Sequence, residues 1–137
     1  MPVPCTRIEG GWATGLPDGG DRIAKIYSLH DFELRPGVDP AEFERVFREE
    51  VAPAPLPPGF GVSLLKSDRG ARDGKFAALL EIEDEGTRGR YFPSGEEQSN
   101  EFHRFMEQHP DTAAAWDSLR SMTLQPETYT DYVVVVE

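Results

Sequence analysis

The sequence of 137 residues contains one cysteine, Cys5, so no disulfide can form within a single chain. Basic residues are also few, because 14 Lys and Arg stand against 25 Asp and Glu, for a formal net charge of −11. Nucleic acids and anionic membrane surfaces bind basic patches, so we expect neither as a partner. No apolar run approaches the length of a membrane span, and the N-terminus lacks the pattern of a signal peptide. We therefore expect a soluble, cytoplasmic protein.

Recognisable motifs for cofactors, metals and covalent catalysis are absent as well. The glycine pairs at 10–11 and 19–20 do not separate a strand from a helix, as a phosphate-binding loop requires. His103 and Glu107 lie four residues apart, but two ligands alone do not define a metal site. No serine or cysteine has a visible base beside it. The sequence therefore predicts neither a resident metal nor a cofactor.

The best-marked stretch is a strand, a turn and a helix over residues 25–51. Asp39 is the predicted N-cap, and Pro40 falls at the first helical position, where its missing N–H costs nothing. Glu42, three residues after the cap, can complete a capping box. Phe43 begins a series of apolar residues at helical spacing, so one face of this helix should be buried.

The strand before this helix carries apolar side chains on both faces. Ile26, His30 and Phe32 share one face, and Tyr27 and Leu29 lie on the other. A sheet with helices on one side and open water on the other would alternate more cleanly. We therefore expect the second face to be covered too.

The rest of the chain divides into a loose segment and one domain. Residues 1–22, rich in Gly and Pro, are predicted to form a flexible N-terminal arm, and residues 23–137 form the domain. Strands are predicted over 60–67, 76–83 and 129–136, with helices over about 99–109 and 111–121. The second of these helices has Asp111 as its candidate cap, and residues 84–95 are an irregular excursion.

The predicted order of elements is β-α-β-β-α(α)-β. This is the ferredoxin-like split βαββαβ arrangement, an α+β fold. Its four-stranded antiparallel sheet carries helices on one face only.

The chain resembles the dimeric α/β-barrel superfamily in three features. These are the βαββαβ order of its elements, Phe43 in the first helix, and the segment Leu34-Arg35-Pro36-Gly37-Val38-Asp39 after the first strand. That group includes small antibiotic-biosynthesis-type monooxygenases and EthD-like and NIPSNAP-like proteins. The resemblance covers residues 25–137 and implies a homodimer in which two sheets pack face to face into a barrel. Some haem-degrading members use an Asn, a Trp and a helical His. Here Asn100 and His103 share one helix, so that role is not carried over.

The candidate site residues are few. His30, in the middle of its strand, could act as a general base or contact a ligand; otherwise it is a hydrogen-bonded histidine of an interface or sheet edge. Arg88, Arg90 and Tyr91 could hold an anion, but Tyr91 could equally anchor its loop to the core. Tyr27 and Trp116 are the remaining candidates for ligand contact.

Two classes of function remain open. The first is a small-molecule binding protein that holds its ligand in the cleft between sheet and helices. The second, implied by the resemblance, is a cofactor-independent monooxygenase-like enzyme acting on an aromatic or polyketide-like substrate, which itself would react with O₂. An enclosed apolar pocket with His30 pointing inward would favour an enzyme.

Overall fold

The computed structural model describes residues 24–95 and 97–136, and the predicted arm over 1–22 lies outside the described residues. Four strands, four α-helices and one π-helical turn follow one another within this part of the chain. In order they are β1 (Ile26–Phe32), α1 (Pro40–Val46), η2 (Phe47–Val51), β2 (Phe60–Lys66), β3 (Phe76–Ile82), α2 (Glu85–Tyr91), α3 (Asn100–Gln108), α4 (Pro110–Arg120) and β4 (Thr128–Val133). No helix among them is long and apolar enough to cross a membrane.

The strands form one sheet in the order β2-β3-β1-β4, and every neighbouring pair is antiparallel. This is the predicted ferredoxin-like α+β fold. The register places His30 of β1 between Ala78 of β3 and Tyr129 of β4. Side chains at alternate positions of each strand point to opposite faces of the sheet. The face that carries His30 is called the inner face below, and the opposite face is called the outer face.

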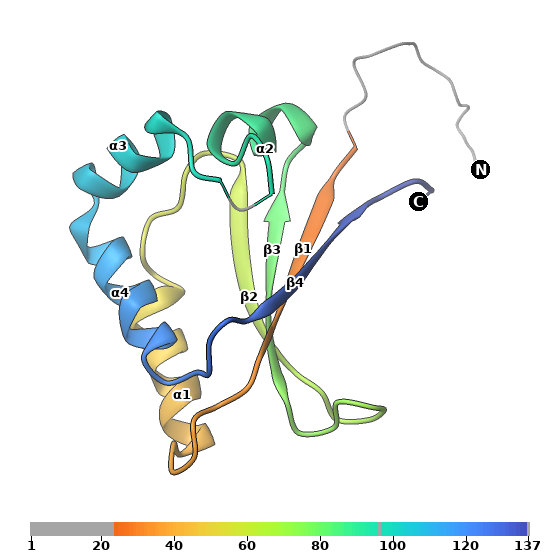
Figure 1. Ribbon diagram of the computed structural model, residues 1–137, viewed down its shortest axis with the longest axis vertical. Coiled ribbons are helices and arrows are strands. Elements are labelled where there is room, and N and C mark those ends of the chain that lie inside the picture. Colours follow the sequence, from red (N-terminus) through yellow and green to blue (C-terminus); the bar gives the residue numbers. More distant parts are fainter. Residues whose placement is uncertain (1–23, 96, 137) are drawn as a thin grey trace.

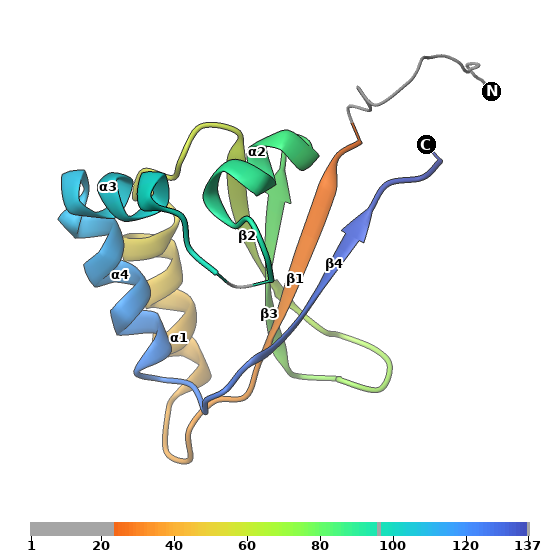
Figure 2. The same ribbon diagram turned by 45° about the horizontal axis from the view of Figure 1, so that its top comes forward.

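All the helices lie on the inner side of the sheet (Figure 1). The helix α1 and its π-helical continuation η2 pack against α4, and α3 connects the regions of α2 and α4. Turning the molecule shows the same separation into a layer of helices and a layer of strands, with β4 at one edge (Figure 2). Within the described residues, no helix or strand covers the outer face.

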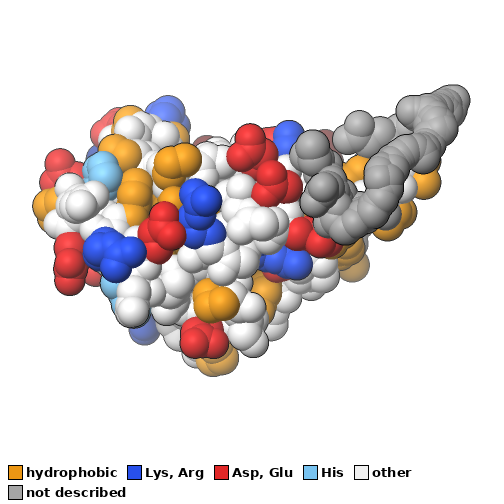
Figure 3. All heavy atoms as spheres, turned by 90° about the horizontal axis from the view of Figure 1, so that it is seen from above, with side chains coloured by type: hydrophobic (Ala, Val, Ile, Leu, Met, Phe, Trp, Pro, Cys, Tyr) orange, Lys and Arg blue, Asp and Glu red, His pale blue; other side chains and the backbone are white. Residues whose placement is uncertain are grey.

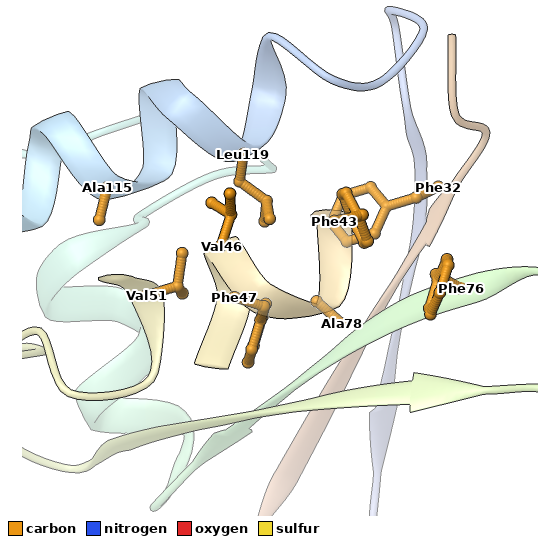
Figure 4. Close-up of a cluster of buried hydrophobic side chains, with 9 residues drawn as sticks. All are labelled: Phe32, Phe43, Val46, Phe47, Val51, Phe76, Ala78, Ala115 and Leu119. Carbon is orange, nitrogen blue, oxygen red and sulfur yellow. The ribbon is translucent and has the colours of Figure 1, made fainter. Parts of the chain in front are cut away.

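The hydrophobic core lies between α1, η2, α4 and the part of the sheet nearest to them (Figure 4). Phe43 is fully buried, and its ring packs against Phe32 of β1 and Phe76 of β3 with centroids 5.7 and 5.0 Å away. Fully burying one such ring contributes about 1.5–3 kcal/mol. This core fixes one end of the helical layer on the sheet.

The start of α1 confirms the predicted cap. The Asp39 carboxylate accepts a hydrogen bond from the Ala41 N–H at 2.9 Å, and Pro40 occupies the first helical position. The predicted capping box is not formed, because the Glu42 carboxylate is bound by Arg45 one turn later. Both carboxylate oxygens of Glu42 bind Arg45 in this exposed ion pair, so neither bonds to the backbone N–H of Asp39.

Three further predictions are corrected. Residues 84–95 contain the helix α2, which begins after Asp84 and ends at Tyr91. Asp111 is not a cap, because α4 begins at Pro110 and His109 stands at the cap position, where its side chain makes no hydrogen bond to the first turn of α4. The last strand ends at Val133 rather than at residue 136, since its pairing with β1 ends at Ile26 and Val133 and is followed by a hydrogen bond from the Val134 N–H to the Lys25 carbonyl. Val135 and Val136 are 79% and 84% exposed.

The connector before β2 approaches α2 closely. Gly59 has a φ of +89°, and a Cβ atom there would lie 2.9 Å from Cγ2 of Thr87. Both the backbone conformation and the space therefore require glycine at this position. The connector can therefore pass close to Thr87 of α2.

Candidate functional site

A cavity of about 500 Å³ lies between the inner face of the sheet and the helices α3 and α4. This volume is in the range of small-molecule sites, about 300–1,000 Å³. Its walls are mainly apolar and aromatic, with Phe60 and Leu80 from the sheet, Phe92 and Phe102 from the α2–α3 region, and Trp116 from α4. The cavity borders the core, with Ala78 and Leu119 common to both.

Polar side chains gather at the β1 and β4 side of this cavity. Ser28 and His30 are two residues apart on β1, so both point inward from one face of the strand. Ser28 Oγ lies 3.0 Å from His30 Nε2. On the other side of the ring, His30 Nδ1 lies 2.8 Å from Glu127 Oε2. The two contacts connect a hydroxyl, an imidazole and a carboxylate in series.

The His30 ring is held in place from several directions. Besides its two hydrogen bonds, it stacks on the ring of Tyr129 with centroids 5.4 Å apart and an interplanar angle of 16°. The His30 and Glu127 side chains are 18% and 17% exposed. Since a carboxylate only accepts hydrogen bonds, the Nδ1–H of His30 donates to Glu127. In the neutral imidazole Nε2 then carries the lone pair and accepts from the Ser28 hydroxyl.

A second charged pair lies beside this series. Arg88 of α2 binds Asp131 of β4, with Nη1 3.0 Å from Oδ2. Asp131 is the neighbour of Ser28 across the β1–β4 pair. The other carboxylate oxygen, Asp131 Oδ1, is buried without a hydrogen-bond partner among the described residues. The cavity therefore has both positive and negative groups at one end and apolar walls elsewhere.

The structure brings three of the six candidate residues to the cavity. His30, Arg88 and Trp116 line it, from β1, α2 and α4. Tyr27 points to the outer face, where it pairs across strands with Tyr132 and Glu81.

The other two predicted residues also lie elsewhere. Arg90 is exposed and lies 3.9 Å from Glu101, whereas the neighbouring candidate Arg88 reaches the cavity. Tyr91 is 4% exposed and packs edge-on against Phe60 with centroids 5.5 Å apart. Tyr91 therefore anchors α2 to the sheet, which is the structural alternative considered for it.

The remaining histidines lie outside the main cavity. His109 caps the end of α3, where its Nδ1 donates to the Phe105 carbonyl at 2.9 Å, close to the negative end of the helix dipole. His103 is exposed and bonds to Gln98. Within residues 24–95 and 97–136 no three His, Cys, Asp or Glu side chains are grouped so that they could hold a metal ion.

Three residues of the polar cluster were not predicted. No serine with a base beside it was expected, but the structure places Ser28 next to His30. The two residues are two positions apart on one strand, so their side chains lie on the same face. This spacing could have identified Ser28 from the sequence. Glu127 is 97 residues from His30 in sequence, and Asp131 is 43 residues from Arg88, so these contacts needed the fold to be known.

The end of the molecule seen from above carries acidic and basic side chains next to one another (Figure 3). No extended patch of one sign is visible on this face despite the net charge of −11. Charge on this face therefore singles out no binding surface, and the cavity is the better-defined feature.

No family model matches the chain, and no curated protein matches it in sequence. Solved structures do match. The protein Rv0793 from Mycobacterium tuberculosis has 11% sequence identity and a TM-score of 0.50, over 82% of this chain and 97% of that one. A dimeric ferredoxin-like protein of unknown function from Thermobifida fusca has 16% identity and a TM-score of 0.49, over 81% and 92%. A DABB-family protein with a ferredoxin-like fold from Mesorhizobium loti has 16% identity and a TM-score of 0.49, over 82% and 99%.

At these levels of identity the likeness concerns the fold. The strand order and pairing of this chain are those of a ferredoxin-like sheet. The Mycobacterium tuberculosis structure shares the overall fold. The predicted ferredoxin-like α+β fold is therefore confirmed.

Proposed function

We propose that the protein binds a small, largely apolar molecule carrying a polar group, in the cavity between the sheet and the helices α3 and α4. The observation that carries this proposal is the combination of a cavity of about 500 Å³ with His30, Arg88 and Asp131 converging at one end. Ligand sites typically combine apolar walls with a few polar groups that fix orientation. The apolar part of the ligand would lie against Trp116 and Phe102.

A cavity-filling variant tests the binding proposal. Leu80 lines the cavity and is half-buried, so Leu80→Trp places a larger side chain in the space a ligand needs. We expect one saturable site per chain for 1-anilinonaphthalene-8-sulfonate or small aromatic acids and esters, measured by fluorescence and calorimetry. Affinity should fall at least about tenfold in Leu80→Trp, since a blocked site loses more than about 1.4 kcal/mol of binding free energy.

The matched control is Leu124→Trp, since Leu124 is 46% exposed in the loop between α4 and β4. This control should bind like the unmodified protein. Equal affinities for all three proteins would place the probe outside the cavity and contradict the proposal.

The aromatic walls favour a second candidate, a cofactor-independent monooxygenase-like enzyme for an aromatic substrate. Phe92, Phe102 and Trp116 line the same cavity as His30. In this reaction a phenolic substrate would replace the Ser28 hydroxyl as the hydrogen-bond donor to His30 Nε2 and would give this nitrogen its proton. The substrate anion would then react with O₂: one oxygen atom would enter the ring as a quinone carbonyl, the other would leave as water, and the substrate would supply all the electrons. Oxygen uptake with a dihydroxynaphthalene, lost in His30→Ala, would support this candidate. Uptake that equals the rate without protein would contradict it.

We also propose that the outer face of the sheet packs against a second copy of the chain. Leu29, Leu79 and Tyr132 lie on this face, and no helix or strand of the described residues covers it. Tyr132 is 55% exposed and Leu65, on the same face, is 42% exposed. Apolar side chains on an uncovered sheet face are typical of an interface. Sedimentation of the purified protein tests this, and a monomer at all concentrations would contradict it.

A further inference from the structure

We propose that Ser28 is a nucleophile and that Ser28, His30 and Glu127 form a catalytic series for acyl transfer from an ester or thioester with an apolar acyl group. This inference rests on the proposed function, because the same cavity must admit the substrate. It adds a reaction and a substrate class that binding alone does not require.

The geometry meets the requirements for an activated serine. A nucleophile needs a base within about 2.6–3.2 Å, and that base needs a third group to orient it. The Ser28 Oγ to His30 Nε2 distance is 3.0 Å, and the His30 Nδ1 to Glu127 Oε2 distance is 2.8 Å. The two contacts use opposite nitrogens of the ring. Such a series is recognised by geometry rather than by the order of residues in the chain.

The surroundings of Ser28 fit a reacting group rather than an exposed surface serine. Ser28 is 4% exposed, and it lines the cavity. A carbonyl carbon can reach Oγ only from the cavity side, where Phe60, Leu80 and Phe92 would receive the acyl chain. Water would be largely displaced by such a chain, which strengthens the electrostatic interactions within the site.

The reaction can be written with every bond and proton accounted for. Ser28 Oγ attacks the acyl carbon while its proton passes to His30 Nε2, and the carbonyl becomes an oxyanion. The bond to the leaving oxygen or sulfur then breaks, and the leaving group takes the proton from His30. Water attacks the acyl–Ser28 ester and gives a proton to His30. The ester bond to Oγ then breaks, His30 returns the proton to Ser28 Oγ, and the carboxylic acid is released. No oxidant or reductant is needed.

Arg88 lines the same cavity and would supply positive charge for the oxyanion. It uses Nη1 to bind Asp131, the cross-strand neighbour of Ser28. A guanidinium has five N–H donors in a fixed fork, so donors remain for a developing negative charge. Donors positioned in this way contribute strongly when the site is shielded from water.

Labelling with a fluorophosphonate tests the nucleophile directly. The probe forms an O–P bond to an activated serine and releases fluoride, so intact mass should increase by one adduct per chain. Peptide mapping should place the adduct on Ser28. A p-nitrophenyl ester of a medium-chain acid should give a burst of about one nitrophenolate per chain, followed by slower turnover.

Matched variants distinguish Ser28 from other serines. Ser28→Ala should lose both the adduct and the burst, with the circular dichroism spectrum unchanged. Ser63 lies on the outer face of β2, opposite Leu79, so Ser63→Ala should label like the unmodified protein. Glu127→Gln should slow labelling at least about tenfold while leaving Ser28 present, because Glu127 acts by positioning His30. Full labelling of Ser28→Ala would overturn the proposal.

The two proposals fail separately. A protein that binds 1-anilinonaphthalene-8-sulfonate in the cavity but gives no adduct and no ester burst would overturn the nucleophile and leave the binding function intact. A protein that gives neither binding nor labelling would overturn both. Labelling on Ser28 that Leu80→Trp abolishes supports both.

Discussion

At the scale of single residues, the bond between His30 and Glu127 is the contact that decides the chemistry of the cavity. Replacing Glu127 by Gln keeps the shape of the side chain but removes its charge, so the bond at His30 Nδ1 weakens. We expect the free energy of unfolding to fall by about 1 kcal/mol, since a bond to a charged group contributes about 1.5–3 kcal/mol and the amide retains part of it. Urea unfolding measures this change.

The same variant has a spectroscopic signature at His30. Nitrogen NMR of the neutral imidazole should show its proton on Nδ1 in the unmodified protein, and Glu127→Gln should give a mixture of the two tautomers. Glu107→Gln is the control, because Glu107 is exposed on α3, and it should change stability by less than about 0.5 kcal/mol. An unchanged tautomer in Glu127→Gln would contradict the assigned role.

Whether a contact of this site can be predicted from the sequence depends on how many residues separate its two partners along the chain. His30 could be singled out because a titratable residue in the middle of an apolar strand is unusual. Ser28 was within reach of the same reasoning, because it is two residues away on one strand face. Glu127 was not, because it follows a loop and meets His30 only when β4 pairs with β1. Local patterns contain no information on that pairing.

At the scale of elements, α2 connects the cap at Asp84 to the cavity through Arg88. The Asp84 carboxylate accepts from the Thr87 N–H at 2.7 Å. Hydrogen bonds from the Thr87 backbone and side chain hold the pKa of Asp84 below its ordinary value of 3.8. A lowered folded-state pKa stabilises the fold above the ordinary value, and this contribution is lost as the pH falls through the folded-state pKa.

The variant Asp84→Asn isolates this effect, because Asn also caps helices but does not titrate. The unmodified protein should be more stable than Asp84→Asn near pH 6, and the difference should shrink as the pH is lowered below 3.8. Urea unfolding of both proteins at each pH measures it, and all other acidic groups cancel in the comparison. A difference independent of pH would mean that the charge of Asp84 contributes nothing.

The helix α2 could not be predicted from the sequence for a physical reason. Gly86 and Gly89 lie inside this helix of seven residues, and glycine costs about 1 kcal/mol relative to alanine at such positions. Besides the Asp84 cap, α2 is stabilised by tertiary contacts, the Tyr91 ring on Phe60 and the ion pair from Arg88 to Asp131. By contrast α1 was predicted well, because its cap and apolar face are both local features.

At the scale of the whole molecule, the order of elements sufficed to predict the fold. Once four strands and two helical regions are placed as βαββαβ, antiparallel pairing and short connections leave few topologies. The observed order β2-β3-β1-β4 is the ferredoxin-like one. A cleft between the sheet and the helices was predicted as the ligand site, but its volume could not be predicted, because it depends on how far α3 and α4 stand from the sheet.

The proposed pairing of two sheets makes a prediction at this scale. Tyr132 is on the outer face of β4, beside Tyr27 of β1, and is 55% exposed. Tyr132→Glu would bury a charge in the interface between two copies, whereas a single chain would leave it in water. Removing an aromatic anchor from an interface costs about 2 kcal/mol or more, so the dimer dissociation constant should rise about 30-fold or more.

Analytical ultracentrifugation over a range of concentrations measures that constant, and Leu124→Glu is the control for an added charge on an exposed apolar residue away from the sheet. The control should sediment like the unmodified protein. Thermal unfolding of Tyr132→Glu at high concentration should also lose its dependence on protein concentration, because dimerisation stabilises the folded chain by mass action. If Tyr132→Glu remains a dimer with an unchanged dissociation constant, then the outer face of the sheet is not where two copies meet.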